Sequence, residues 1–421
     1  MAVISRRQFS KAAGLGIGAL TFPNLALGAK PKVVVIGGGA GGATAARHIS
    51  KETNSAVDVT LIEASRRYYT CFYSNLYLGG YRSYASIGHN YYGLAVKHGV
   101  NIIHDWAISI DPSRRLVKLG SGASIPYDRL ILSPGIDFKY ESVPGYTPEV
   151  QSRMPHAWRS GTQTQLLRSQ VLNMKKGGIF VMVPPTNPYR CPPAPYERVS
   201  MVAHLLKNNN PTAKVIILDP KPKFAKQGLF MDGWEKHYSG MIEWIDPEAH
   251  GGIKSIDASK MEFVTDLDTF TADAACVIPA QKAGAIATTA SVNDGDWCPV
   301  HPNTMASKAD PNIYVLGDAS VAKSMPKSGS SANSQAKVAA NAICHELTGS
   351  AIVPAQYTNT CWSLIATNDS IKVGANYKAG VSTIEVVTKF ISKKDETAQV
   401  RKSTYEESVD WYKAITADMF S

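Results

Sequence analysis

Long apolar runs are missing from the sequence after its first thirty residues. A helix needs about 18 consecutive apolar residues to span a membrane, so we expect no membrane span in the body of the chain. Dense basic runs interleaved with aromatic side chains are missing too, although the formal net charge is +10. Such runs are typical of proteins that bind nucleic acids, so we expect no nucleic acid as a partner. The basic excess points instead to an anionic substrate or an acidic partner.

Cysteine is scarce, with six residues among 421, and no haem attachment motif is complete. That motif reads Cys-x-x-Cys-His, and the pair Cys344-His345 has Asn341 where the first cysteine would stand. We therefore expect no haem on this chain, and we predict no metal site. Cys276 lies in an apolar run typical of a strand, and we interpret it, Cys298 and Cys344 as structural or incidental.

The first 29 residues have the pattern of an export signal. The pair Arg6-Arg7 precedes an apolar run over residues 12–22, and small residues, among them Ala29, follow that run. This order is that of a signal peptide, and the paired arginines are those of the twin-arginine route. We therefore expect residues 1–29 to be a twin-arginine signal and the protein to be periplasmic. The alternative is a disordered basic arm.

A glycine loop follows a β-branched run over residues 32–36, which predicts a buried parallel strand. Gly37, Gly39 and Gly42 have the spacing G-x-G-x-x-G, with Ala40 inside the loop. The first glycine allows a tight turn, the second lets the backbone approach a pyrophosphate, and the third lets a helix pack on the strand. The loop therefore predicts a dinucleotide site.

The elements around the loop make this motif more specific than the glycines alone. A helix is expected over residues 43–50, and a second strand over residues 57–62 ends at Glu63. A carboxylate at this point, about 20 residues after the loop, can accept hydrogen bonds from ribose hydroxyls. The segment therefore predicts a complete Rossmann-like unit.

Two later segments favour FAD over NAD as the dinucleotide. Residues 127–135, which end at Gly135, resemble the strand and turn that return to the nucleotide in flavoproteins with two dinucleotide domains. Gly317 and Asp318 resemble a second FAD motif, in which the aspartate binds the ribityl chain and the next helix points its N-terminus at the flavin. We expect that helix over about residues 331–343. The alternative role for Asp318 is a helix N-cap.

A second Rossmann-like unit is expected in the middle of the chain, but its nucleotide site is missing. Its first strand, residues 178–183, leads into Pro-Pro-Thr-Asn-Pro-Tyr-Arg-Cys-Pro-Pro, which contains no glycine. A pyrophosphate needs backbone N–H groups, and prolines remove them. Cys191 lies in this loop, shortly before a helix expected over residues 194–206. Its place near a helix N-terminus predicts a lowered thiol pKa; the alternative is a buried structural cysteine.

With these features the sequence resembles the flavoprotein subunit of flavocytochrome c sulfide dehydrogenase, within the sulfide:quinone reductase-like flavoproteins. The resemblance covers nearly the entire chain and is carried by the twin-arginine start, the glycine loop, Tyr68-Tyr69-Thr70-Cys71, residues 187–198, Gly317-Asp318-Ala319 and Thr360-Cys361-Trp362-Ser363. It implies an α/β fold with two Rossmann-like dinucleotide-binding domains, as in glutathione reductase, and a smaller C-terminal α+β domain. The implied boundaries are 30–143 with 281–349 for the FAD domain, 144–280 for the second domain and 350–421 for the C-terminal interface domain.

The resemblance also implies roles for individual residues. Cys71 matches the cysteine that carries FAD covalently, as a thioether to the 8α-methyl group of the ring; the alternative is a free or structural cysteine. Cys191 and Cys361 match a redox disulfide at the flavin. Glu197 is a candidate proton acceptor, although an acid in the first turn of a helix also stabilises that helix. Trp411 is implied to cover the flavin.

The implied reaction is oxidation of sulfide to zero-valent sulfur or polysulfide. Hydrosulfide attacks the disulfide by thiol–disulfide exchange, and the electrons pass through FAD to a separate c-type cytochrome subunit. One alternative is a membrane-associated sulfide:quinone reductase, which would need an apolar C-terminal surface. Residues 393–421 are largely polar, which favours the first reading. The other alternative is a non-catalytic exported flavin-binding redox subunit.

Overall fold

The protein is described here by a computed structural model over residues 29–421. The predicted export signal, residues 1–29, lies outside these residues apart from its last position. The helices are α1 (Gly42–Glu52), α2 (Ser74–Leu78), α3 (Tyr92–His98), α4 (Thr162–Leu172), α5 (Ala194–Asn209), α6 (Gln227–Tyr238), α7 (Pro247–His250), α8 (Ile286–Thr289), α9 (Gly329–Thr348) and α10 (Ala398–Phe420). None of these helices is long and apolar enough to cross a membrane.

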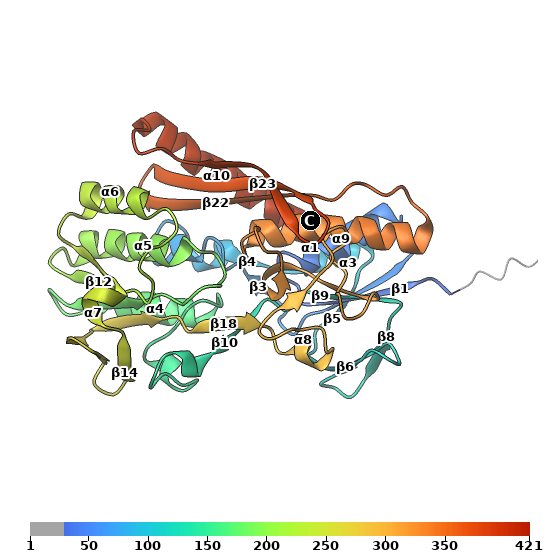
Figure 1. The fold of residues 1–421 in the computed structure, drawn as a ribbon, viewed down its shortest axis with the longest axis horizontal. Coiled ribbons are helices and arrows are strands. Elements are labelled where there is room, and N and C mark those ends of the chain that lie inside the picture. The colour runs from blue at the N-terminus through green and yellow to red at the C-terminus, as the bar shows by residue number, and fades with distance from the viewer. Residues whose placement is uncertain (1–28) are drawn as a thin grey trace, which may run out of the picture. The chain divides into compact units, whose positions relative to one another are not determined.

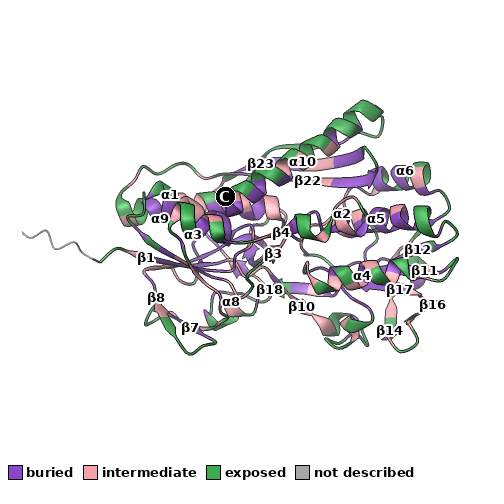
Figure 2. Cartoon of the chain, turned by 180° about the vertical axis from the view of Figure 1, so that it is seen from behind, coloured by how far each residue is buried: buried purple, intermediate pink, exposed green. Residues whose placement is uncertain are grey.

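The first unit is built on a parallel five-stranded sheet. In spatial order its strands are β20 (Ile313–Val315), β9 (Arg129–Leu132), β1 (Lys32–Ile36), β2 (Asp58–Ile62) and β5 (Asn101–Ile103). Strand β1 is central and pairs in parallel with β2 and β9. Its β-branched side chains are buried, as expected for a strand covered on both faces. Helices α1 and α9 pack against each other on one face, as Figures 1 and 2 both show.

The second unit repeats this design with a four-stranded parallel sheet. Its strands, in spatial order, are β13 (Ile242–Ile245), β12 (Lys214–Leu218), β11 (Ile179–Val183) and β17 (Ala274–Val277). A small antiparallel sheet at its edge contains β14 (Ile253–Asp257), β15 (Glu262–Thr265) and β16 (Thr269–Thr271). The central strand β11 is buried and flanked by β12 and β17.

One antiparallel strand pair links the two units. Strand β10 (Ile136–Lys139) carries the chain out of the first unit, and β18 (Ala280–Ala283) brings it back. The predicted domain boundaries after residues 143 and 280 fall beside this pair, and they stay predictions. The remaining strands of the first unit are β3 (Tyr68–Tyr69), β4 (Gly88–His89), β6 (Ala107–Asp111), β7 (Leu116–Leu119), β8 (Ser124–Pro126), β19 (Cys298–Pro299) and β21 (Ser320–Val321).

The C-terminal segment forms an antiparallel sheet and a long helix that lie over both units (Figure 1). The strands are β22 (Gln356–Ala366), β23 (Asp369–Ala379) and β24 (Ile384–Ile391). Strand β22 contacts α9 of the first unit and α5 of the second, and α10 contacts α1. Figure 2 shows that β22 is largely buried while much of α10 is exposed. This placement brings Cys361 of β22 to the junction of the two units.

Candidate functional site

A cavity of about 460 Å³ lies at the carboxyl ends of the first sheet. Its walls include most of the predicted dinucleotide-binding residues, namely Gly37, Gly39, Ala40, Glu63, Cys71, Gly135, Gly317 and Asp318. Gly37 has φ of +97° and a Cβ there would lie 2.3 Å from the carbonyl oxygen of Ser133, so only glycine fits. Gly42 does not line the cavity; a Cβ there would lie 1.9 Å from the Gly37 oxygen, which explains the third glycine as a packing residue.

Glu63 is held at the rim of this cavity by two backbone amides. Its Oε2 accepts a hydrogen bond of 2.8 Å from the Gly38 N–H, and its Oε1 accepts one of 2.9 Å from the Ser65 N–H. Glu63 directly follows β2, as the sequence predicted. The carboxylate therefore sits where a Rossmann-like unit binds a ribose.

Asp318 has a buried carboxylate with one oxygen unused. Its Oδ2 lies 3.7 Å from Nη1 of Arg190, and its Oδ1 has no hydrogen-bond partner among the described residues. Burial raises the pKa of this carboxyl, although Arg190 and Lys327 oppose the rise. Ser328, not Asp318, caps α9, since its Oγ accepts from the Ser331 N–H at 3.0 Å. The N-cap alternative is therefore wrong, and the unused oxygen is available to a hydroxyl of a bound ligand.

A second, smaller cavity of about 80 Å³ adjoins the first. The residues that line both are Cys71, Phe72, Arg190, Ser328 and Gly329. The three predicted catalytic residues, Cys191, Cys361 and Glu197, also line the smaller cavity, and so does Trp411. Its volume admits a few small groups, since a water molecule needs roughly 10–15 Å³ on this measure. Predicted residues from four distant segments thus meet in one place.

Cys191 and Cys361 come from different parts of the fold and face each other. Cys191 lies in the loop between β11 and α5 with φ of +55°, and its N–H donates to the Lys327 oxygen at 2.7 Å. Cys361 lies on β22 and lines the same cavity as Cys191, and the two thiols influence each other's pKa. Both are free thiols in this structure, so their disulfide stays a prediction.

The expected pKa order of the two thiols is reversed. The interaction between them raises the pKa of Cys191 and lowers that of Cys361 to about 7. Burial also raises the pKa of Cys191, whereas Lys226 and Asn359 help to lower that of Cys361. The prediction of a lowered pKa at Cys191 was therefore wrong, because the interaction with Cys361 and burial both raise it.

Glu197 is half-buried and lines the same cavity as the cysteines, in the first turn of α5. Its Oε2 accepts from Nδ2 of Asn75 at 2.8 Å, and its Oε1 accepts from the Leu364 N–H at 2.9 Å. Burial raises the pKa of this carboxyl, although these two hydrogen bonds limit the rise. A raised carboxyl pKa suits a group that takes up and releases protons near neutral pH.

Aromatic side chains close the cavity on the side of α10. The ring of Trp411 lies 5.4 Å from that of Phe72, in an edge-on arrangement, and 5.1 Å from that of Trp362. Phe72 directly follows Cys71, so Trp411 lies near the wall shared by the two cavities. Its role as a cover over the flavin stays a prediction.

Several residues of the site were not predicted from the sequence. Asn75 binds Glu197 and also accepts from Nε of Arg198 at 3.0 Å. Arg198, only 2% exposed, donates to the backbone oxygens of His156 and Ala157. Asn75 stands four positions after Cys71, which is the only local signal for it.

The carboxyl ends of the second sheet differ in chemistry from those of the first. Asp219 directly follows β12, and its Oδ1 forms an ion pair of 2.7 Å with Nζ of Lys221. Its Oδ2 accepts from the Tyr196 hydroxyl at 2.6 Å and from Nε1 of Trp244 at 3.0 Å. A nearby cavity of about 200 Å³ is lined mostly by prolines and aliphatic residues, among them Val183, Pro184, Pro185, Pro220, Pro247 and Ile278. Neither a free carboxylate for a ribose nor a glycine cradle for a pyrophosphate is present at this edge.

The glycine cradle, the unused Asp318 oxygen and the facing cysteines define the class of the protein, a flavoprotein with the fold of the pyridine nucleotide-disulphide oxidoreductases. The model of that broad family matches residues 31–175. Residues 164–279 match the central part of the flavoprotein chain of sulfide dehydrogenase (flavocytochrome c), and residues 353–420 match the flavin-binding part of flavocytochrome c sulphide dehydrogenase. Together these matches support a flavoprotein like those of flavocytochrome c sulfide dehydrogenase and sulfide:quinone oxidoreductase.

Individual relatives agree with this assignment at low identity. The mitochondrial sulfide:quinone oxidoreductase of Mus musculus is 23% identical over 303 residues, covering 68% of this chain and 65% of that protein. Its counterpart in Dictyostelium discoideum is 23% identical over 184 residues, covering 44% of this chain and 40% of that protein. The match thus spans less than two thirds of either relative.

Solved structures share the fold over most of the chain. The sulfide:quinone oxidoreductase from Aquifex aeolicus has a TM-score of 0.67 at 18% identity, covering 90% of this chain and 91% of that one. An NAD-dependent persulfide reductase from A. fulgidus has a TM-score of 0.64 at 17% identity, covering 89% of this chain and 77% of that one. The predicted α/β fold with two Rossmann-like domains is therefore confirmed.

Proposed function

We propose that this flavoprotein oxidises sulfide to zero-valent sulfur in the periplasm and passes the electrons to a c-type cytochrome subunit. The observation that carries the proposal is the pair of facing sulfurs, Cys191 and Cys361, in a cavity that shares a wall with the dinucleotide cradle. The family assignment supports it, since two of the matching family models describe a flavocytochrome c.

The residues of the larger cavity suit FAD. The cradle that begins at Gly37 would hold the pyrophosphate, Glu63 a ribose, and the unused Asp318 oxygen a ribityl hydroxyl. Cys71 lies where the two cavities meet, and we propose that it carries the flavin covalently. Peptide mapping of the acid-denatured protein tests this: we expect the Cys71 peptide to carry the mass of the flavin, and an unmodified peptide would contradict the linkage.

In the proposed reaction, hydrosulfide attacks the sulfur of Cys191 in the disulfide. The S–S bond breaks, Cys361 leaves as a thiolate and a persulfide forms on Cys191. We assign the leaving role to Cys361 because a thiol of lower pKa leaves faster, and its pKa lies near 7. Glu197 lines the same cavity and accepts the proton of the attacking sulfur.

A second hydrosulfide then takes the outer sulfur from the persulfide on Cys191. Two hydrosulfide ions thus become one hydrogen disulfide ion, one proton and two electrons, which remain on the two cysteine thiolates. FAD supplies the two-electron acceptor that allows the disulfide to form again. Asn75 and the Leu364 N–H hold Glu197 in place through the cycle.

The test is anaerobic mixing of the purified flavoprotein with sulfide. We expect rapid bleaching of the visible flavin band, and we expect its loss in Cys191→Ser and Cys361→Ser. Cys344→Ser is the matched control, because Cys344 is buried on α9 away from the cavity. A flavin that sulfide does not bleach would leave only the non-catalytic reading.

The electron acceptor is tested with the sulfide-reduced protein. We expect a c-type cytochrome to reoxidise it much faster than a soluble quinone does. The opposite order would favour the quinone-reducing alternative. The similarity to sulfide:quinone oxidoreductases is the reason to test it.

A further inference from the structure

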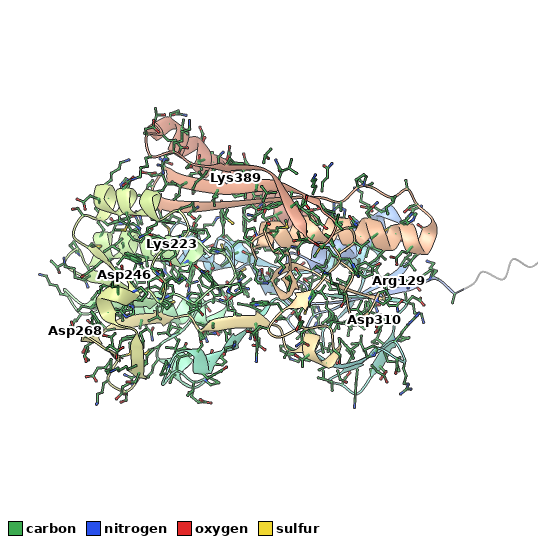
Figure 3. All side chains as sticks on the ribbon, in the orientation of Figure 1. Arg129, Lys223, Asp246, Asp268, Asp310 and Lys389 are labelled. Atoms are coloured by element: carbon green, nitrogen blue, oxygen red, sulfur yellow. The ribbon has the colours of Figure 1, made fainter. Side chains whose placement is uncertain are left out.

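Lys226 is a buried lysine that reaches from the second unit to the C-terminal sheet. It stands just before α6 with φ of +63°. Its Nζ donates to the Cys361 oxygen at 3.1 Å, to Oγ of Ser363 at 2.8 Å and to the Ile371 oxygen at 3.4 Å. Lys223, labelled in Figure 3, is exposed on the same segment, whereas Lys226 is only 7% exposed. A lysine is almost never buried in this way without a specific reason.

The charge of Lys226 is not balanced by a contacting carboxylate. All three of its hydrogen bonds go to neutral oxygens, and within residues 29–421 it forms no ion pair. Burial lowers its pKa to about 8, and the groups that favour its charged form are, from the largest effect to the smallest, Cys361, Glu197 and Cys191. A buried cation without a counter-ion is costly. The cost falls when a negative charge appears beside it, and ionisation of Cys361 supplies that charge.

The interaction between Lys226 and Cys361 also affects the pKa of the cysteine. After the interaction with Cys191, Lys226 is the next group that lowers the pKa of Cys361, and Asn359 follows. Burial and the charge of Glu197 act in the opposite direction. The other titratable groups that face Cys361 or Lys226 are Tyr377 and Arg401. The positive charge of Lys226 thus favours the Cys361 thiolate.

We propose that Lys226 stabilises Cys361 as the leaving thiolate when the disulfide opens, and so directs the attack of hydrosulfide to Cys191. It acts through Cys361 and does not touch the substrate, so it is a positioning residue. The inference rests on the proposed function for its place in the reaction. The stabilised thiolate itself is a property of the chain and can be measured without sulfide.

The test measures the ionisation of Cys361 in the full holoprotein after a phosphine has reduced the disulfide. Alkylation by iodoacetamide is followed at each pH by peptide mass spectrometry, which separates Cys361 from Cys191. In the unaltered protein we expect Cys361 to react with a pKa near 7. An ordinary thiol profile at Cys361 would overturn the proposal before any variant is made.

In Lys226→Met we expect the Cys361 pKa to rise by about one unit, so that the thiolate fraction, and with it alkylation, falls about fivefold at pH 7. Lys226→Gln keeps a side-chain donor without the charge and carries the same expectation if the methionine variant does not fold. Lys226→Arg should restore the profile. Ser363→Ala removes one of the same hydrogen bonds but keeps the ammonium, so it should leave the Cys361 profile in place.

An unchanged alkylation profile in Lys226→Met or Lys226→Gln would overturn the inference and leave Lys226 with a purely structural role. The proposed function fails separately, if sulfide does not bleach the flavin of the unaltered protein. If both claims hold, the sulfide-dependent bleaching rate of Lys226→Met falls by roughly threefold to tenfold near neutral pH and recovers in Lys226→Arg.

Discussion

The two Rossmann-like units have the same backbone plan and opposite chemistry at the ends of their strands. In the first unit, Gly37 directly follows the central strand and Glu63 directly follows the next one. In the second unit, Pro184 and Asp219 stand at the corresponding positions after β11 and β12. The two parallel sheets thus have equivalent positions at the ends of their strands. The residues at these positions decide whether a dinucleotide can bind there.

The two carboxylates show the difference most clearly. Glu63 is held by backbone amides at the rim of an open cavity. Asp219 is fully buried and bound by Lys221, Tyr196 and Trp244. The second unit has therefore turned a ribose-binding position into a buried structural ion pair. The loop after β11 leads to Cys191. Lys221 Nζ donates a hydrogen bond of 2.8 Å to the Pro185 oxygen in this loop.

The largest effect should follow from a substitution that blocks the dinucleotide cradle of the first unit. In Gly37→Val the added side chain meets the Ser133 oxygen, in a backbone conformation that disfavours any side chain. We expect a cost of several kcal/mol at the cradle, roughly 1–2 from the backbone and the rest from overpacking. The purified protein should carry almost no flavin, as its visible absorption would show.

Gly122→Val is the control for that change. Gly122 also has a positive φ, +93°, but a Cβ there meets nothing within 4 Å. We expect normal flavin content in this variant. Equal flavin content in the two variants would mean that the loop does not hold the dinucleotide.

The next effect comes from breaking the ion pair of the second unit. Asp219→Asn leaves Lys221 charged, buried and without its counter-ion, which costs about 3–5 kcal/mol of unfolding free energy. Denaturant unfolding measures this. The exposed pair Lys394–Asp232 gives the control, and Asp232→Asn should cost no more than about 1 kcal/mol.

Asp219→Asn also sharpens the comparison between the units. We expect the variant to gain no affinity for NADH, because Pro184 and Pro185 still remove the donors that a pyrophosphate needs. NADH binding in the variant, measured by fluorescence, would show that the ion pair alone had closed the site.

The smallest effect concerns the contact that ties α10 to the first unit. Asp418 of α10 lies 3.1 Å from Nη1 of Arg47, 2.9 Å from Nε2 of His48 and 2.9 Å from Nζ of Lys337. Burial alone would raise the pKa of Asp418, but hydrogen bonds from His48, Asn333 and Lys337 bring it well below its usual range. Burial would lower the pKa of His48, yet Asp418 and Glu52 raise it overall.

These two shifts give opposite pH dependences. The contribution of Asp418 is present above its ordinary pKa of 3.8 and is lost as the pH falls below that value. The contribution of His48 is complete below 6.5 and is lost as the pH rises through its raised pKa. Unfolding followed by Trp fluorescence should thus show a small stability loss on each side of this window.

Asp418→Asn should flatten both sides of that profile. Asp410→Asn is the control, because Asp410 is largely exposed and, among residues 29–421, its ion pair is with Lys413 on the same helix. A pH profile that Asp418→Asn leaves unchanged would mean that the contact contributes nothing measurable.

The fold and the dinucleotide cradle could be predicted because their signals are local. The strand before Gly37, the glycine spacing and the acid at Glu63 all lie within one βαβ segment, and the observed α1 and β2 differ from the expected ranges by only one or two residues. The prolines that close the second unit are local as well. Each of these features depends on backbone geometry that neighbouring residues decide.

The charges of the site could not be predicted in the same way. The pKa of Cys191 depends on Cys361, which meets it only in the folded chain. Lys226 carries no motif, and its contact with the oxygen of Cys361 joins residues 135 positions apart. The N-cap alternative for Asp318 also needed the structure, since α9 begins at Gly329, later than that role would require.

Reduction of one protein sample by two kinds of donor tests the contrast between the units most directly. The flavoprotein is titrated anaerobically with sulfide and, in parallel, with NADH and NADPH, while the visible flavin band is followed. We predict that sulfide bleaches the band and that neither nicotinamide does, because the second unit holds Cys191 where a nucleotide would otherwise bind. Bleaching by NADH or NADPH, with sulfide inactive, would contradict this account.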